Sequence, residues 1–392
     1  MTTRGSATRR TILKTGGVAA LAMAAGAGAE SAAAEPVLRS DLQAALDDVV
    51  VAGASGALAE FRDGASVWRG SSGVAELGTS RPVPVGGRFR IGSVTKTFVA
   101  TVVLKLVGRG RLRLDDTVEH WLPGTITNGD RITLRHLLQH TSGVFDFVAR
   151  FGELFPTTED LLRQRYRTWS PTELVALAAE MPPVFEPGTS WSYSNTNYFL
   201  LAMVVERATG RPYGTEVQRH ILRPLGLRDT EVPGDNPFLR GPHSHGYLPL
   251  RQDGQIVPAD VTTFNPTIAW AAGEIISTPA EINHFFLALL TGRLLSPALL
   301  EQMLSPSAGP GYALGIGRFP LPCGDTLWGH TGGFFGYQTF AVTSADGQRQ
   351  LTVSANPWGG NPGRAISALV QTAFCGSAAA TAEPLWLPEM AI

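Results

Sequence analysis

The chain has 392 residues, of which 44% are hydrophobic and 17% charged, an ordinary composition for a globular protein with a large core. Its formal net charge of −1 gives no reason to expect binding to nucleic acid or to an anionic membrane surface. Beyond the N-terminus, no window of about 20 residues is apolar enough for a membrane-spanning helix. We therefore expect a globular protein with no nucleic-acid partner and no stable membrane span.

The N-terminus has the three parts of an export signal. Arg9 and Arg10 form a twin-arginine pair, an Ala- and Gly-rich apolar stretch covers 16–28, and the alanines at 32–34 offer a cleavage site. The alternative is an ordinary amphipathic helix, but this stretch has almost no polar face. We predict a twin-arginine-type signal peptide over 1–34 and a secreted or extracytoplasmic protein.

The spacing of apolar residues predicts the secondary structure of the remaining chain. The expected elements, in order, are a helix over 38–51, a hairpin over 55–74, a buried helix over 93–107, helical segments and loops over 111–230, a helix opening at 278–281, antiparallel strands over 312–355 and a last helix over 364–374. Strands at both ends with a helical middle indicate an α/β (α+β) fold, in which an antiparallel sheet is flanked by helices and an all-helical lobe is inserted.

This pattern also predicts the division of the chain. One domain is expected over 35–376, followed by a C-terminal tail over 377–392. Within the domain, the α/β lobe would comprise about 35–110 and 240–376, and the helical lobe about 111–239. Because pockets favour the interfaces between lobes, we expect the functional site there.

Ser93 and Lys96 stand three residues apart at the start of a predicted helix, so both side chains leave one face. A neutral amine beside a serine can take its proton, and serine needs such an activator because its free hydroxyl is a weak nucleophile. The chain has only three lysines, Lys14, Lys96 and Lys105, and lysine can lose its proton where arginine cannot. Taken alone, the segment also fits a capped helix with a surface lysine.

Tyr193 and Asn195 lie one residue apart after a run of loop-forming residues. A phenol whose pKa is lowered by a nearby ammonium can shuttle protons, and an amide can orient an acyl substrate. The alternative interpretation is an N-terminal cap for the helix expected from about Asn197.

His330, Thr331 and two glycines, Gly332 and Gly333, lie in the strand-rich C-terminal part. Glycine there permits close approach of another backbone or a substrate. A backbone N–H from this strand and that of Ser93 would form an oxyanion hole. The alternative is a glycine-rich hairpin turn.

Three further observations leave alternatives open. His136 and His140 are four residues apart on a helix, but no third metal ligand is evident, so we expect a structural segment and no metal. Trp270 either walls a substrate cleft, which we favour, or fills the core. Cys323 and Cys375 form one disulfide in an oxidising compartment or remain two buried thiols.

The order of the three motifs, Ser-x-x-Lys, then Tyr-Ser-Asn, then His-Thr-Gly, resembles that of the penicillin-recognising serine hydrolases. Tyr in the middle motif is similar to the class C β-lactamase and D-alanyl-D-alanine carboxypeptidase branch, in particular the secreted actinomycete carboxypeptidases. The resemblance covers roughly Leu38 to Gly376 and includes Phe89–Lys96, His140–Gly143, Tyr193–Asn197, Trp270, Gly329–Gly332 and the contexts of Cys323 and Phe374–Gly376.

The resemblance implies a β-lactamase/transpeptidase-like fold and four catalytic residues. Ser93 would be the nucleophile, Lys96 would set its protonation, Tyr193 would carry the proton of the leaving group, and His330 would line the site. The substrate-binding residues that it implies are Asn195, Thr331, Gly332 and Trp270. It also implies a Cys323–Cys375 disulfide, no metal or organic cofactor, and a monomer that acts on a peptide or peptidoglycan-like substrate, with β-lactams as possible ligands.

Two positions depart from the carboxypeptidase pattern. Gly317 stands where an Arg is expected, and Gly333 where Thr is usual. Both residues of the pattern would contact a free C-terminal carboxylate, for which Arg is suited by its bidentate fork, and Arg318 would point to the opposite face of its strand. The resemblance thus predicts a D-alanyl-D-alanine carboxypeptidase or related D-peptide hydrolase. The alternatives are an esterase or D-stereospecific endo- or aminopeptidase, and, more remotely, a non-catalytic penicillin-binding protein.

Overall fold

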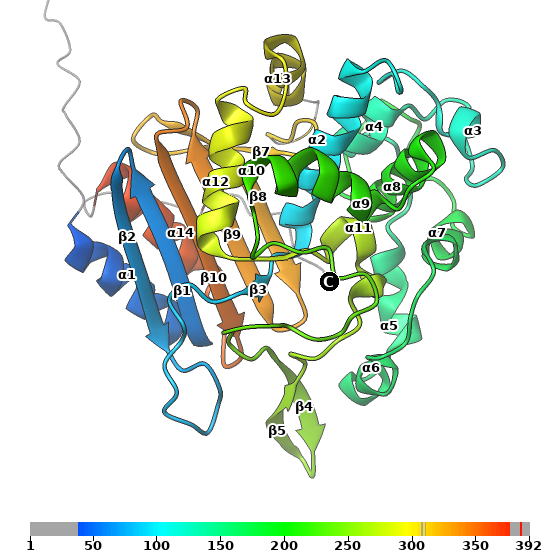
Figure 1. Cartoon of the computed structure of the whole chain (residues 1–392). Helices are drawn as coiled ribbons and strands as arrows, with labels where there is room; N and C mark the ends of the chain where they lie inside the picture. Colours follow the sequence, from blue (N-terminus) through cyan, green and yellow to red (C-terminus); the bar gives the residue numbers. More distant parts are fainter. Residues whose placement is uncertain (1–37, 307–308, 310, 377–384, 386–392) are drawn as a thin grey trace, which may run out of the picture. The chain divides into compact units, whose positions relative to one another are not determined.

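A six-stranded antiparallel sheet forms the centre of the structure (Figure 1). The computed structural model describes residues 38–306, 309, 311–376 and 385, which belong to one unit of the chain, Glu35–Ile392. The strand order is β2-β1-β10-β9-β8-β7. The strands are β1 (Ala54–Asp63), β2 (Ser66–Gly73), β7 (Gly317–Pro320), β8 (Thr326–Phe334), β9 (Tyr337–Ser344) and β10 (Arg349–Pro357).

The two ends of the described chain meet in this sheet. The N-terminal hairpin β1–β2 joins the C-terminal strands because β1 pairs with β10, with Ala59 opposite Val353 and Phe61 opposite Leu351. These apolar pairs are buried on the pleated surface, which stabilises the long-range pairing. The predicted hairpin over 55–74 and the predicted strands over 312–355 are confirmed.

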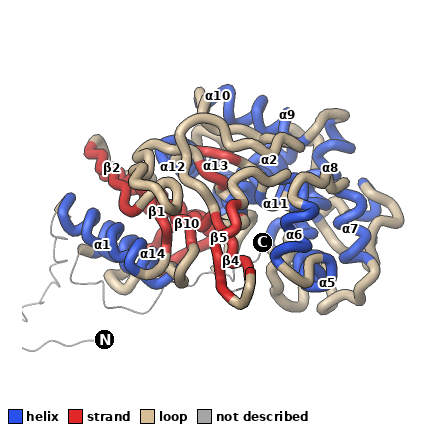
Figure 2. The backbone as a smooth tube through the Cα atoms, turned by 90° about the horizontal axis from the view of Figure 1, so that it is seen from below, coloured by secondary structure: helices blue, strands red, loops and turns tan. Residues whose placement is uncertain are grey.

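Helices cover both faces of the sheet, as Figures 1 and 2 show from two directions. Helices α1 (Arg39–Val51) and α14 (Gly363–Cys375) pack on one face, where a buried apolar cluster includes Leu46 and Leu369. Helix α12 (Pro279–Leu290) packs against β9 and β10 on the other face. The predicted antiparallel sheet flanked by helices is therefore confirmed.

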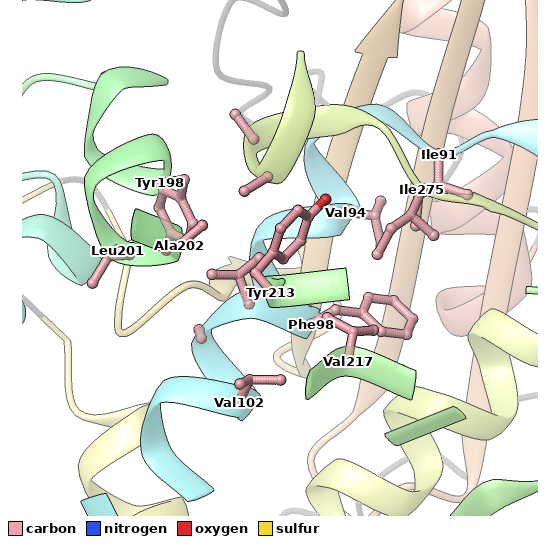
Figure 3. Packing of buried hydrophobic residues seen from close by; sticks show 14 of the residues in the cluster. Ile91, Val94, Phe98, Val102, Tyr198, Leu201, Ala202, Tyr213, Val217 and Ile275 are labelled. Atoms are coloured by element: carbon pink, nitrogen blue, oxygen red, sulfur yellow. The ribbon is translucent and has the colours of Figure 1, made fainter. Parts of the chain in front are cut away.

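Helix α2 (Thr95–Gly108) passes through the second and larger apolar cluster of the molecule. Almost every residue of its first three turns is buried, which agrees with the apolar spacing of this segment in the sequence. Figure 3 shows side chains of α8 (Thr196–Thr209) and α9 (Tyr213–Val217) gathered around it. The start of α2 is thus fixed by packing on several sides.

Most of the remaining helices lie together on one side of the sheet (Figure 1). These elements are α3 (Val118–Trp121), α4 (Leu134–Gln139), α5 (Phe151–Leu154), α6 (Thr158–Gln164), α7 (Pro171–Ala179) and α11 (Trp270–Gly273). The other two described α-helices are α10 (Arg223–Leu225), which contacts α12, and α13 (Pro297–Leu304). Two short pairs complete the fold: β3 (Phe89–Arg90) with β6 (Ile276–Ser277), and a projecting hairpin of β4 (Tyr247–Gln252) and β5 (Gln255–Asp260).

Two predicted segments fall outside this description. The signal peptide over 1–34 and the tail over 377–392, apart from Leu385, lie outside the described residues. Within the described ranges, no helix combines the length and apolar character that a membrane span requires.

Candidate active site

Ser93 lies in a single 3₁₀ turn, Gly92–Val94, directly before α2. The turn requires glycine at 92, where φ is +52° and a Cβ atom would lie 2.4 Å from the carbonyl oxygen of Gly333. No side chain caps α2, and Lys96 is 0% exposed. The alternative interpretation, a capped helix with a surface lysine, is therefore wrong.

The Lys96 Nζ atom has three hydrogen-bond partners, each at 2.8 Å. They are Ser93 Oγ, Asn195 Oδ1 and the carbonyl oxygen of Ala272. Burial lowers the pKa of Lys96 to about 7, since the ammonium loses its hydration, while Asp146 acts in the opposite direction. Near neutral pH a large fraction of Lys96 is thus a free amine.

These partners decide where the lone pair of that amine points. The oxygens of Ala272 and of the Asn195 side chain can only accept hydrogen bonds. A neutral amine has two N–H donors, so both are directed to these two oxygens. The lone pair then faces Ser93 Oγ, which is the one partner that carries a proton to give.

Tyr193 joins this group from the loop before α8. Its hydroxyl is hydrogen-bonded to Ser93, and Lys96 Nζ lies 4.9 Å from the centre of its ring. Burial raises the pKa of Tyr193 well above its ordinary value, and the bond to Ser93 only partly offsets this. The expectation that the ammonium lowers the pKa of this phenol is therefore wrong: Tyr193 is a neutral proton donor.

Asn195 is the N-cap residue of α8 but makes no side-chain cap hydrogen bond. Its Oδ1 faces Lys96, and its Nδ2 donates to Asp146 Oδ2 at 3.0 Å. The capping interpretation of this loop is thus excluded for Asn195.

Asp146 was not predicted from the sequence as a residue of the site. The signals that could have found it are its place just after the His140–Gly143 motif and before a short helix that it caps.

The end of β8 beyond Gly329, where β7 no longer pairs with it, lies against the nucleophile turn. A Cβ on Gly332 would be 2.0 Å from the Ile91 carbonyl oxygen and 3.2 Å from the Ser93 nitrogen. The β8–β9 hairpin closes at Phe334 and Tyr337, and hydrogen bonding alternates along the strands from there. Gly333 therefore directs its N–H away from β9, on the side where β8 meets the Ser93 turn. The glycines lie within the strand, so the hairpin-turn alternative is wrong.

His330 is held as a neutral ring beside this edge. Burial lowers its pKa to about 3. Its Nδ1–H donates to the Thr331 carbonyl at 2.5 Å, and its Nε2 accepts from the Tyr312 hydroxyl at 2.8 Å. Because both ring nitrogens are hydrogen-bonded to other residues, the ring holds its neighbours in place and does not transfer a proton. Thr331 is buried in the same strand.

Other predicted residues lie around this group. The Trp270 ring is half-buried and packs edge-on against Phe199 and Tyr213, with centroids 5.3 and 5.0 Å away. The same segment contributes the Ala272 carbonyl to the site.

His136 belongs to the cap of α4, where it accepts from the Thr133 N–H. Among the described residues, no group of three or more metal-ligating side chains is close enough to hold a metal ion.

The two cysteines form a disulfide, Cys323–Cys375, with Cα atoms 5.7 Å apart. It ties the end of α14 to the turn between β7 and β8. Two separate thiols are therefore excluded.

Comparison with known proteins shows which family the chain belongs to. The model of the beta-lactamase family matches residues 42–373, which is most of the chain. The chain belongs to the beta-lactamase family. The penicillin-recognising resemblance and the fold class predicted from the sequence are thereby confirmed.

Relatives within the beta-lactamase family differ in what their names say they do. Penicillin-binding protein 4* of Bacillus subtilis is 27% identical over 77% of this chain and 68% of its own length. Esterase EstB of Burkholderia gladioli is 29% identical over 79% of this chain and 87% of its own. A solved D-stereospecific amidohydrolase from Streptomyces is 40% identical and superposes with a TM-score of 0.78, covering 86% of this chain and 99% of that one. The chain is thus a serine hydrolase of this family whose substrate the family alone does not give.

Proposed function

We propose that the chain hydrolyses the amide bond that follows a D-amino acid residue, through an acyl-enzyme on Ser93. The observation that carries the proposal is the arrangement around Lys96, whose two acceptor partners leave the lone pair for Ser93. Its pKa of about 7 supplies the free amine near neutral pH. Such a base is what a serine hydroxyl needs to attack a carbonyl carbon.

Acylation follows from this arrangement. The Ser93 oxygen bonds to the substrate carbonyl carbon as Lys96 takes the hydroxyl proton, and the carbonyl becomes an oxyanion. In this proposal, that charge is stabilised by the N–H groups of Ser93 and Gly333, and the direction of the Gly333 N–H away from β9 supports this role. The Tyr193 hydroxyl then gives a proton to the leaving nitrogen and regains one from the Lys96 ammonium, so the C–N bond breaks and an ester remains. Water attacks this ester, and the same groups return the proton to Ser93.

The other predicted residues receive supporting roles. We propose that the second Nδ2 hydrogen of Asn195 contacts the acyl part of the substrate, and that Thr331 and Gly332 line the bound peptide along β8. His330 keeps Tyr312 and the Thr331 backbone in place as a neutral ring. Trp270 remains a predicted substrate-binding residue, with its ring anchored in the core.

The choice of a D-residue amide over a carboxypeptidase substrate rests on position 317. In β7, Gly317 is buried while Arg318 is exposed on the opposite face of the strand. The arginine that would hold a free C-terminal carboxylate therefore has no counterpart at this position. The similarity to a D-stereospecific amidohydrolase supports the same choice. Esterase EstB supports a second candidate, an esterase, because the same acyl-enzyme forms from an ester.

The predicted location also remains a proposal. The export pattern over 1–34 and the Cys323–Cys375 disulfide support action outside the cytoplasm. The monomeric state stays a prediction.

The test measures hydrolysis of a matched set of amide and ester substrates by the purified protein. We expect hydrolysis of a D-alanine amide, little or no hydrolysis of the L-isomer, and no preference for a D-Ala-D-Ala peptide with a free C-terminal acid over its C-terminal amide. A clear preference for the free acid would instead support the carboxypeptidase. Hydrolysis of esters alone would support the esterase, and no turnover of any member of the set would support the non-catalytic penicillin-binding protein.

A further inference from the structure

Asp146 and Asn195 face each other because their loops are joined. The Thr196 hydroxyl donates to the Phe145 carbonyl at 2.8 Å and accepts from the Phe147 N–H at 3.1 Å. This hydroxyl thus holds the residues on both sides of Asp146. The Asp146 carboxylate also accepts from the backbone N–H two residues further on, which fixes its own rotamer.

The side-chain amide of Asn195 has one orientation that satisfies both neighbours. A carboxylate accepts only, so the NH₂ end must face Asp146, where the Nδ2–Oδ2 distance is 3.0 Å. An ammonium donates only, so the oxygen end must face Lys96 at 2.8 Å. The two requirements agree, and Asp146 therefore selects the orientation even when Lys96 has lost its proton.

The reversed amide would disable the base. With the Asn195 NH₂ turned toward a neutral Lys96, that NH₂ would donate to the amine lone pair, which would no longer face Ser93. We infer that Asp146 is a positioning residue: it holds the Asn195 amide so that the Lys96 lone pair stays on Ser93, and it is the counter-charge of the Lys96 ammonium. This inference rests on the proposed acyl-enzyme chemistry for its catalytic consequence, but its structural content can be measured without turnover.

The other titratable groups that face Lys96 are uncharged near neutral pH. Burial raises the pKa values of the phenols and lowers those of the imidazoles, and these groups are Tyr193, Tyr198, His140 and His330. Asp146 is the group whose charge raises the pKa of Lys96 among the described residues. Its own pKa is raised by burial to about 6, so it is mostly ionised at pH 7. Loss of this charge must lower the pKa of Lys96.

The experiment uses the small number of lysines. The full chain contains Lys14, Lys96 and Lys105, so selective ¹³Cε-lysine labelling gives three NMR signals, which Lys96→Arg and Lys105→Arg assign. Each signal is followed from pH 5 to 11 in the wild type and in Asp146→Asn. In that variant, the side-chain oxygen is taken by the backbone N–H, and its NH₂ faces that of Asn195, which favours the reversed amide.

Two further variants complete the design. Asp146→Ser keeps a side-chain oxygen for the backbone turn but has no charge, and it serves if Asp146→Asn folds poorly. Asp346→Asn is the matched control, because Asp346 makes the same bond to the N–H two residues on, in the turn between β9 and β10. Acylation by a fluorescent penicillin is measured on the same samples as a second readout.

We expect the midpoint of Lys96 to fall by about one pH unit in both Asp146 variants. It should stay at its wild-type value in Asp346→Asn, and Lys105 should not move in any variant. Acylation should slow by about 10²-fold in Asp146→Asn, the value of a correctly placed base. An unchanged Lys96 midpoint would overturn the inference, even with slower acylation, since loss of structure alone would then explain it. A shifted midpoint in a protein that neither forms an acyl-enzyme nor hydrolyses the D-alanine amide would retain the Asp146–Lys96 coupling and reject the proposed function instead.

Discussion

The outer face of the sheet, which α1 and α14 cover, and the site around Ser93 are both largely buried, but they are built differently. On the outer face, α1 and α14 cover an almost wholly apolar cluster that includes Leu46, Val353 and Leu369. Around Ser93, the buried polar groups include the Lys96 amine and the Asn195 amide, which are bonded to each other. They also include the phenols of Tyr198 and Tyr312 and the His330 imidazole, each with a hydrogen-bond partner. In the first region, burial of apolar side chains stabilises the fold. In the second, burial removes water from Lys96 and so lowers its pKa. The difference predicts that damage to one region lowers stability and damage to the other lowers activity.

The largest effect is expected at Lys96. Lys96→Arg should slow acylation of Ser93 by about 10³-fold, because a guanidinium does not give up its proton and so offers no lone pair. The control is Lys105→Arg on the same helix, whose amine only donates to the Leu294 carbonyl at 2.8 Å. It should acylate at the wild-type rate. Fast acylation by Lys96→Arg would remove Lys96 from the mechanism; stopped-flow labelling with a fluorescent penicillin measures both.

A smaller loss is expected at the strand edge. Gly332→Ala places a methyl group 2.0 Å from the Ile91 carbonyl oxygen, so β8 must move away from the Ser93 turn. We expect kcat/KM to fall by about 10²-fold through loss of one oxyanion donor. Gly152→Ala, where a Cβ meets no atom within 4 Å, is the matched control and should keep wild-type activity. Equal activity of the two variants would show that the position of β8 does not affect catalysis.

The pH dependence should follow the base. Since the neutral amine of Lys96 is required and its pKa is about 7, kcat/KM should rise about tenfold per pH unit below pH 7 and level off above it. If Lys96 had the ordinary lysine pKa of 10.5, kcat/KM would keep rising up to about pH 10.5. A stopped assay with short incubations at each pH separates this limb from acid unfolding. A profile that still rises steeply above pH 9 would contradict the lowered pKa.

The smallest effect on activity is expected on the outer face. Leu369→Ala removes a wholly buried side chain of α14 and should lower the free energy of unfolding by about 3 kcal/mol, mostly from the cavity that it leaves. Denaturant unfolding measures this loss. The value of kcat at 25 °C should remain that of the wild type, because no atom of this cluster bonds to the Ser93 group. A proportional fall in kcat would mean that the two regions are coupled.

The sequence predicts the outer face and α2 well, for a physical reason. Apolar residues at helical spacing or in short runs imply burial: α1 and α2 follow helical spacing, and β1 is a short run that is buried along most of its length. The β4–β5 hairpin was not predicted. Its residues are mostly exposed on both faces, and Pro249 and Pro258 interrupt the strand pattern, so no alternation marks it.

The sequence motifs predicted which residues form the site, but not how their pKa values are shifted. Ser93, Lys96, Tyr193 and Asn195 were found by type and order, and the structure brings all four together. The Ala272 carbonyl has no sequence signature, because every residue has a carbonyl. The direction of the Tyr193 pKa depends on burial by the surrounding fold, which spacing along the chain does not give.

The most direct test is to locate the acyl group itself. The protein is treated with benzylpenicillin, quenched in acid and digested with trypsin, which cuts after Arg90 and Lys96. We predict the added mass of one opened penicillin on the Ile91–Lys96 peptide, at Ser93, and none in Ser93→Ala. The label on any other residue, or on Ser93→Ala, would contradict this prediction.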